Sequence, residues 1–353
     1  MPEYKRSEAK QWARDRYRGL ETVLLPSLKE EVTEEGSTWN LDEAGIRHDV
    51  EMCKKHGFFM CTAAIEGGTF MMMEYMLRDF WEIVVDQAAG EILVDAYISA
   101  NTLEDLISTA QLAQDCGVDA MMLAYPPYFY PKNGDEVVEF TQKVCESVDL
   151  AVTAYATHKP NFERFHNSTF DPRLLSRIAD IENVAAMKLG VIDPSHNYEC
   201  FQRFGKKILP AAVFPDLWNV FVPACGQQWA GSAPYEVFQD PDKRYLVDQF
   251  TLLTQGRYDE AMELHWKLYP CMKTIWKYAE PTIYEGNYNV MHWKYWGWLA
   301  GMNGGPMTLP ISRMYEHQKE EFRQARRILG LSVPENDEEF YVGRVNYGKP
   351  GGA

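Results

Sequence analysis

The sequence predicts an α/β protein, built as a (β/α)₈ TIM barrel with a C-terminal helical extension. Three observations support this: eight short apolar runs recur between residues 19 and 234, helical patterns separate them, and only helical patterns follow residue 235. Apolar strands that alternate with helices are typical of a parallel sheet covered by helices, and eight such units can close into a barrel. The alternative is an open, doubly wound sheet, but its dinucleotide fingerprint G-x-G-x-x-G does not follow the first run.

The order of the runs gives the expected domain organisation. An N-terminal arm (1–18) precedes the barrel (19–235), and a helical extension packed on the barrel (236–331) precedes a polar tail (332–353). The tail is rich in Gly and Pro, so we expect it to be disordered or to lie across a neighbouring subunit. The expected strands are residues 19–28, 57–65, 91–100, 119–127, 149–157, 184–191, 208–215 and 227–234.

Two of the helical patterns between these strands are especially clear. Residues 41–57 carry apolar side chains at three- and four-residue steps, as one face of a buried helix requires. Residues 102–117 begin with Thr102 as a candidate cap, followed by two acidic residues in the first turn.

Composition narrows the possible partners. A net charge of −16 disfavours nucleic acid and anionic membranes, because both need a basic surface. No apolar stretch reaches the roughly 18 to 20 residues of a membrane span, and the charged N-terminus lacks a signal core, so a soluble, cytoplasmic protein is expected. The seven cysteines form no C-x-x-C pair, which argues against a zinc site. We expect a small-molecule substrate and neither a cofactor nor a metal.

One apolar run contains a lysine. In "VAAMKLGV" (184–191), strand alternation points Lys188 into the barrel, near the carboxyl end where sites of this fold lie. A buried ammonium is costly, so such a group tends to lose its proton and become a nucleophile that forms imines with carbonyl compounds. The alternatives are neutralisation by a carboxylate inside the barrel, or a side chain that extends to the rim.

The preceding run ends in "AYATHKP" (154–160), which places Tyr155 one strand away from Lys188 at an equivalent height. A phenol beside an imine-forming lysine can transfer the protons that dehydration and carbon–carbon cleavage require. Simple core packing is the alternative. His158 is a candidate second acid/base or substrate contact, although a loop position without a chemical role is favoured.

Aromatic residues gather near the expected barrel entrance. In "QQWAGSAP" (227–234), Trp229 and Ser232 are expected at the mouth, where the indole could stack on an aromatic substrate; core packing is an equal alternative for Trp229. Tyr97, Phe214 and Trp218 follow other strands nearby. This favours an apolar or aromatic carbonyl compound over a sugar phosphate.

These motifs give the chain a resemblance to a known family. From about Leu20 to Leu331 it resembles the dihydrodipicolinate synthase and N-acetylneuraminate lyase superfamily of class I aldolases, in "YPPYFYPKNGDEVVEF" (125–140), "AYATHKP" and "MKLG". The resemblance implies a (β/α)₈ barrel with Lys188 as the Schiff-base lysine, Tyr155 in the proton relay, and a homo-oligomer, either a dimer or a tetramer. Residues 77–86 and 288–310 are most similar to the branch that splits trans-o-hydroxybenzylidenepyruvate into an aromatic aldehyde and pyruvate.

The chain departs from the family at the loop after the second strand. Relatives carry G-x-x-G-E there, with hydroxyls and amides that hold the carboxylate of a keto acid. The matching "AIEGG" has Glu66, Gly67 and Gly68 without a hydroxyl, and Glu66 would repel a carboxylate unless it is protonated or turned away. Thr69 or Thr62 could substitute, and Glu66 could itself act as an acid/base or bind a hydroxyl or cationic group.

A second departure lies in "PPYFYP", where relatives often carry paired tyrosines. Here Tyr128 is followed by Phe129 and then Tyr130, so either tyrosine could complete the relay.

The leading hypothesis is a cofactor-independent carbon–carbon lyase, an aldolase or hydratase-aldolase. It would act on a bulky apolar or aromatic carbonyl compound, with a 2-oxo acid that yields pyruvate as one candidate. The alternative is a non-catalytic barrel of the same superfamily that acts as a ligand-binding sensor or regulatory subunit. A divalent-metal aldolase is disfavoured, because no His and carboxylate cluster lies at the strand ends.

Overall fold

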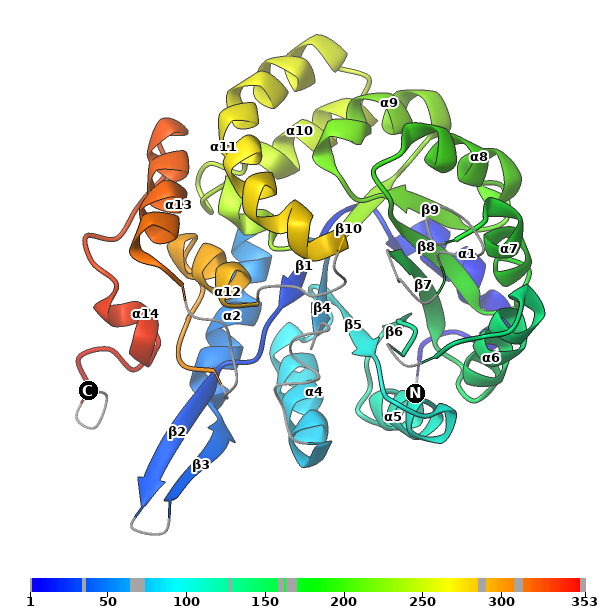
Figure 1. Ribbon diagram of the computed structural model, residues 1–353, viewed down its shortest axis with the longest axis horizontal. Helices are drawn as coiled ribbons and strands as arrows, with labels where there is room; N and C mark the ends of the chain where they lie inside the picture. Colours follow the sequence, from blue (N-terminus) through cyan, green and yellow to red (C-terminus); the bar gives the residue numbers. More distant parts are fainter. Residues whose placement is uncertain are drawn as a thin grey trace.

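The computed structural model describes residues 2–33, 36–63, 74–126, 129–157, 162, 170–284, 290–307 and 314–349. Eight parallel strands form a nearly closed barrel in the order β10-β1-β4-β5-β6-β7-β8-β9 (Figure 1). At the seam β9 and β10 lie side by side, and the described residues form no β-ladder between them. The strands are β1 (Gly19–Leu24), β4 (Met60–Ala63), β5 (Leu93–Ile98), β6 (Ala120–Leu123), β7 (Ala151–Thr157), β8 (Val184–Gly190), β9 (Leu209–Ala212) and β10 (Trp229–Ala233).

The predicted TIM barrel is therefore confirmed, and each barrel strand falls within one of the eight predicted ranges. Outer helices connect the strands, and their ends follow from local chemistry. The Thr102 hydroxyl accepts a hydrogen bond from the Asp105 amide at the start of α5, as a helix cap does. Gly57 ends α2 with a φ of 80°, which favours glycine. The helices are α2 (Glu43–His56), α4 (Glu74–Ala88), α5 (Leu103–Asp115), α6 (Gly134–Glu146), α7 (Pro172–Ile178), α8 (Pro194–Phe204) and α9 (Pro215–Cys225).

An antiparallel hairpin that the sequence patterns did not predict follows β1. It consists of β2 (Leu28–Thr33) and β3 (Gly36–Leu41), and it projects from the body of the protein (Figure 1). Its first strand is largely charged, "LKEEVT", because it does not enter the barrel core. The hairpin therefore lacks the apolar run by which the barrel strands were recognised.

The N-terminal arm closes the amino end of the barrel. A short 3₁₀ segment, η1 (Arg6–Glu8), leads into α1 (Ala9–Arg16), which contacts β7 and β8. Tyr17 then packs edge-on against Trp229, with 5.5 Å between the ring centroids. The bottom of the barrel is thereby filled with aromatic side chains and alanines.

The predicted position of Trp229 at the barrel mouth is wrong. Trp229 is the first residue of β10, pairs with Gly19 at the start of β1, and donates its Nε1 hydrogen to the Leu209 carbonyl oxygen at 3.2 Å. It is fully buried at the closed end. The strand begins two residues later than predicted, so Trp229 lies at the opposite end from any substrate entrance.

Helices of the extension cover one side of the barrel and reach over its carboxyl end. Within the extension, fully buried Arg326 of α13 joins that helix to the segment after β10, by donating to the Val237 carbonyl at 2.9 Å and by pairing with Asp240. None of the helices in the described ranges is both long and apolar enough to span a membrane. The extension consists of η3 (Tyr235–Phe238), α10 (Tyr245–Thr254), α11 (Tyr258–Tyr284), α12 (Val290–Leu299), α13 (Glu316–Ile328) and α14 (Glu338–Val342).

The polar tail packs on its own chain over residues 332–349, so the expected disorder is not found there. Asp337 pairs with Arg323 and, at 2.8 Å, with Lys319 of α13. Phe340 is 1% exposed, and its ring centroid lies 5.1 Å from that of Tyr295. One buried aromatic and a partly buried carboxylate anchor a segment whose composition is otherwise polar.

Candidate active site

Lys188 and Tyr155 lie opposite each other on the paired strands β8 and β7. Lys188 is 1% exposed, and its Nζ atom lies 3.9 Å from the centroid of the Tyr155 ring. A cation at this distance is attracted to the negative face of an aromatic ring. Parallel pairing in register sets both side chains at one height in the barrel, so the structure brings together the amine and the phenol that the sequence singled out.

Both residues line a hollow at the carboxyl end of the barrel. The space between its walls amounts to about 550 Å³, which includes the part open to solvent. The described walls are mostly apolar and aromatic, and we call this site the aromatic hollow. Its described lining residues are Tyr155, Thr157, Lys188, Gly190, Val213, Phe214, Pro234, Phe238, Ile275, Trp276, Ala279, Trp293 and Trp296.

The tryptophans of this wall come from the helical extension. Trp276 belongs to α11, while Trp293 and Trp296 belong to α12. The ring of Phe214, which follows β9, meets that of Trp276 at a centroid distance of 5.4 Å. The extension therefore completes a site that the barrel strands begin.

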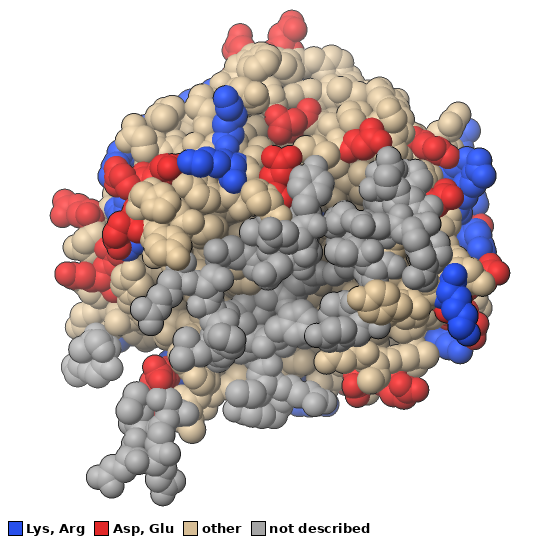
Figure 2. Space-filling model, in the orientation of Figure 1, with Lys and Arg blue, Asp and Glu red and all other residues tan. Residues whose placement is uncertain are grey.

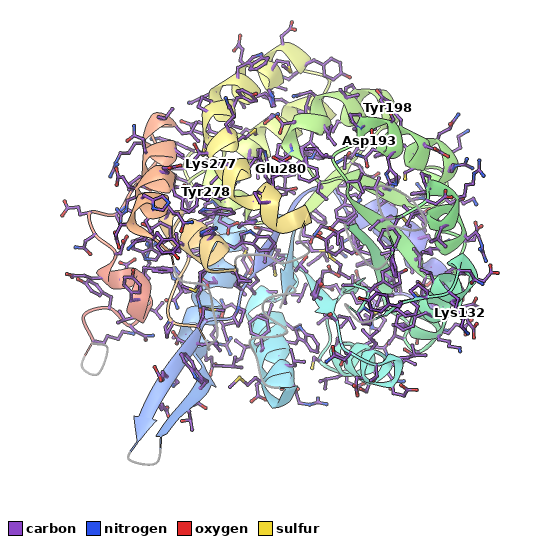
Figure 3. The ribbon with its side chains drawn as sticks, in the orientation of Figure 1. Lys132, Asp193, Tyr198, Lys277, Tyr278 and Glu280 are labelled. Atoms are coloured by element: carbon purple, nitrogen blue, oxygen red, sulfur yellow. The ribbon has the colours of Figure 1, made fainter. Side chains whose placement is uncertain are left out.

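Helix α11 presents a different side to α13. Lys277 and Tyr278 lie on that side (Figure 3), where Lys277 Nζ pairs with Glu321 at 2.7 Å and the Tyr278 ring packs edge-on against Phe322. Because these contacts hold one side of α11 against α13, its Trp276 side remains available to line the hollow.

The structure does not describe the side chains of several predicted site residues. Ser232 lies in β10, but its side chain is not among those described. The predicted substrate contacts that lie outside the described residues are Glu66, Gly67, Gly68, Thr69, Tyr128 and His158.

The remaining aromatic candidates divide between hollow, core and surface. Phe214 lines the hollow, whereas Tyr97 and Trp218 are fully buried and are not among its described lining residues. Trp218 donates its Nε1 hydrogen to the Ala212 carbonyl at 2.9 Å, so it is a core residue rather than part of the entrance. Tyr130 is 66% exposed, and Phe129 stacks on Phe140 at 4.4 Å.

The sequence argument missed two buried acids whose ionisation is affected by the charge of Lys188. Glu21 of β1 and Asp95 of β5 are fully buried, and we call them the carboxyl pair. The Thr62 hydroxyl donates to Glu21 Oε1 and lies 3.4 Å from Asp95 Oδ2. Both acids occur within apolar runs, "GLETVLL" and "EILVDAYISA". The pattern that identified Lys188, a charged residue inside an apolar run, was therefore present for them too.

Burial controls the ionisation of this pair. It raises the pKa of Glu21 to about 7, although the nearby charge of Lys188 and the Thr62 hydrogen bond oppose this shift. Burial and the charge of Glu21 raise the pKa of Asp95 well above its ordinary value. Thr62 is thus engaged between two protein carboxyl groups, which makes it a poor substitute for the missing carboxylate clamp.

Another buried lysine, Lys294 of α12, has different surroundings. Its Nζ donates hydrogen bonds to the Pro26 carbonyl at 3.0 Å, the Pro306 carbonyl at 3.1 Å and Met307 Sδ at 2.9 Å. Burial lowers its pKa to about 7, against the opposing charges of Asp49 and Asp42. Lys294 lies in the wall of a separate, smaller hollow of about 360 Å³.

Comparisons with known proteins agree with this geometry. The family model described as "Dihydrodipicolinate synthetase family" matches residues 40–327. The chain is 24% identical over 310 residues to 4-hydroxy-tetrahydrodipicolinate synthase of Methanothrix thermoacetophila, covering 87% of this chain and 95% of that protein. It is also 24% identical over 303 residues to the protein of that name from Methanopyrus kandleri, covering 84% and 92% of the two chains.

Solved structures share the fold. Dihydrodipicolinate synthase from Aquifex aeolicus superimposes with a TM-score of 0.74 at 19% identity, covering 91% of this chain and 100% of that one. The structure titled "PhdJ bound to substrate intermediate" gives 0.73 at 17% identity, covering 93% and 97%. N-acetylneuraminate lyase from Fusobacterium nucleatum gives 0.70 at 15% identity, covering 88% and 96%. With a family model that spans most of its length, the chain belongs to the dihydrodipicolinate synthetase family.

Proposed function

We propose that the protein is a cofactor-independent carbon–carbon lyase in which Lys188 forms an imine with the substrate carbonyl and Tyr155 transfers the protons. The observation that carries the proposal is the position of the Lys188 amine, 3.9 Å from the Tyr155 ring centroid and in the wall of the aromatic hollow. A buried amine in the wall of a hollow is suited to nucleophilic attack on a carbonyl carbon.

The proposed reaction keeps its atoms in balance. The neutral amine adds to the carbonyl carbon, and the hydroxyl of the resulting carbinolamine takes the phenol proton of Tyr155 and leaves as water. This gives the cationic imine and leaves Tyr155 as the phenolate that acts as base in the next step. This cation accepts the electron pair of the breaking carbon–carbon bond and becomes a neutral enamine, while the other fragment leaves as an aldehyde. Tyr155 removes the hydroxyl proton of the departing fragment and then protonates the enamine carbon, after which water releases the second product.

The substrate class follows from the walls of the hollow. Phe214, Trp276 and Trp296 offer flat, apolar surfaces, which favours a bulky aromatic or apolar carbonyl compound over a phosphorylated sugar. Among the described residues, the buried Nε1 hydrogens of Trp276 and Trp296 find no hydrogen-bond acceptor. Either indole could therefore donate to a carboxylate or carbonyl oxygen of the substrate after a small side-chain rotation.

We further propose a 2-oxo acid as substrate, with pyruvate as one product and hydration of a conjugated double bond as an additional step. The relatives named 4-hydroxy-tetrahydrodipicolinate synthase and N-acetylneuraminate lyase support the general class of reaction. A cytoplasmic location and a homo-oligomer, either a dimer or a tetramer, also remain proposals. Acidic and basic side chains both occur around the rim of the face shown in Figure 2.

Reductive trapping tests the mechanism directly. Pyruvate, aromatic 2-oxo acids and aromatic aldehydes are each incubated with the protein and borohydride, and the adduct is read by intact mass and peptide mapping. We expect one adduct per chain, on Lys188. The absence of any adduct, together with full lyase activity in Lys188→Ala, would remove the mechanism; an adduct or binding without any turnover would instead favour the sensor alternative.

A further inference from the structure

The barrel interior near Lys188 contains buried polar side chains, whereas barrels of this fold usually fill their interior with branched apolar side chains. Glu21 comes from β1, Thr62 from β4, Asp95 from β5 and Thr153 from β7, and all four side chains are fully buried. Two carboxyl groups in such a place are destabilising unless something compensates them. The amino end of the barrel is filled with an apolar cluster, so water at that end does not solvate the two carboxyl groups.

The geometry indicates that the carboxyl pair shares one proton. A single hydroxyl, that of Thr62, lies within hydrogen-bonding distance of both acids. Among the described residues, the other oxygens, Glu21 Oε2 and Asp95 Oδ1, have no hydrogen-bond donor. Two charges so close in a dry interior repel strongly, so one carboxyl is protonated and the other ionised.

The barrel also makes room for this charge. A Cβ atom at Gly231 of β10 would overlap Glu21 Oε2, so glycine at that position leaves the space that the carboxyl group occupies. The charge of Lys188 acts on both members of the pair and opposes the effect of burial on each. If the pair carries one negative charge and Lys188 one positive charge, the three groups together have no net charge.

We propose that the carboxyl pair, Glu21 and Asp95, holds one proton and one negative charge, and that this charge is the built-in counter-ion of the cationic imine at Lys188. The inference rests on the function proposed above. The pair acts through Lys188, so its members are positioning residues. It stabilises the cation that must accept electrons during bond cleavage, and it does so without exchanging a proton with the substrate.

Other titratable groups among the described residues lie near the pair. Burial raises the pKa values of Tyr17, Tyr235 and Cys61 well above their ordinary values, so these groups stay neutral. Burial also raises the pKa of Asp119, whose carboxylate accepts the Val94 amide hydrogen at 2.8 Å outside the pair. The Tyr155 ring lies 3.9 Å from Lys188 Nζ, so its removal would disturb the lysine itself and is kept out of this test.

The first test uses isosteric amides: Glu21→Gln, Asp95→Asn and the double variant. The rate of borohydride trapping with pyruvate is measured against pH, alongside kcat. Loss of the negative charge favours the neutral amine, so the double variant should shift the trapping profile to lower pH by about one unit or more and lower kcat by about tenfold or more. Each single variant should show a smaller shift, because the remaining acid ionises in its place.

Glu236→Gln is the matched control. Glu236 is also a fully buried acid, but it accepts a hydrogen bond from Thr22 at 2.6 Å and lies outside the pair. Its substitution should leave the trapping profile where it is in the wild type. Equal profiles in the double variant and the wild type, or an equal shift in Glu236→Gln, would overturn the proposal.

The second test does not depend on catalysis. Infrared difference spectroscopy of the whole protein at neutral pH should show a protonated carboxyl band that disappears in the double variant. Lys188→Met removes the compensating charge, so the pair should take up a second proton and the band should increase. An unchanged band in Lys188→Met would overturn the counter-ion role, whereas the failure of every carbonyl compound to form an adduct with the wild type would overturn only the proposed function.

Discussion

Lys188 and Lys294 are both buried lysines close to acidic side chains, yet their surroundings differ. The Lys294 ammonium donates to two backbone carbonyl oxygens and a thioether, which join α12 to Pro26 after β1 and to Pro306. Lys188 lies over the Tyr155 ring and in the wall of the aromatic hollow. The first arrangement satisfies an amine inside the protein, and the second presents one to a ligand.

The comparison shows that burial and a nearby acid do not by themselves identify an imine-forming lysine. Burial lowers the pKa of Lys294 to about 7, which would also suit a nucleophile. Its hydrogen-bond partners, however, occupy the directions from which a carbonyl carbon would approach. A phenol at the same height and an adjoining space for substrate are the features that distinguish Lys188.

Replacing each of the two lysines in turn should give the largest difference in reductive trapping and turnover. Lys188→Ala should abolish reductive trapping and lower lyase turnover by about 10⁴-fold or more, because the covalent step is lost. Lys294→Met should still form the adduct at Lys188 to the same extent per folded chain. Intact mass after borohydride treatment measures both, and a trapped adduct on residue 294 in the wild type would contradict the assignment.

Tyr155→Phe should affect the Lys188 site less severely. The ring that packs under the ammonium remains, but the hydroxyl that transfers protons is removed, so turnover should fall by about 10²- to 10³-fold while the imine is still trapped. Steady-state rates compared with single-turnover trapping separate the two steps. Loss of trapping and turnover in equal proportion would show that the hydroxyl is needed before the imine forms.

The pH dependence of stability should reveal the structural role of Lys294. Its pKa is about 7 in the folded protein against 10.5 ordinarily, so the unfolded chain binds more protons in that interval and the contribution of Lys294 to stability grows as pH rises. The free energy of unfolding of the wild type minus that of Lys294→Met should therefore increase between about pH 7 and pH 10, by a few kcal/mol at most. Urea titrations at several pH values measure it, and a flat or falling difference would disagree.

The smallest effects concern the walls of the aromatic hollow, whose described lining includes Lys188 but not Lys294. Trp276→Leu should raise KM for an aromatic 2-oxo acid by about 5- to 20-fold and change KM for pyruvate by less than about twofold, because stacking area is lost on one side. Trp266→Leu is a control, since Trp266 lies on the exposed side of α11. Equal effects on both substrates would argue against an aromatic substrate.

The sequence patterns were sufficient for the parts of this protein that depend on local periodicity. Eight apolar runs at regular spacing predicted the barrel, and strand alternation predicted that Lys188 points inward beside Tyr155. Both conclusions need only the two-residue period of a strand and the parallel pairing of neighbours. The acids at positions 21 and 95 could have been recognised by the same rule.

Other features depend on contacts between segments that are far apart in the chain. The position of Trp229 at the closed end follows from where β10 begins relative to β1, and the docking of the tail depends on how Phe340 and Asp337 meet α12 and α13. The three tryptophans of the aromatic hollow come from two helices that fold back over the barrel. A residue pattern records which face of its own element is apolar, but it carries no record of the partner against which that face packs.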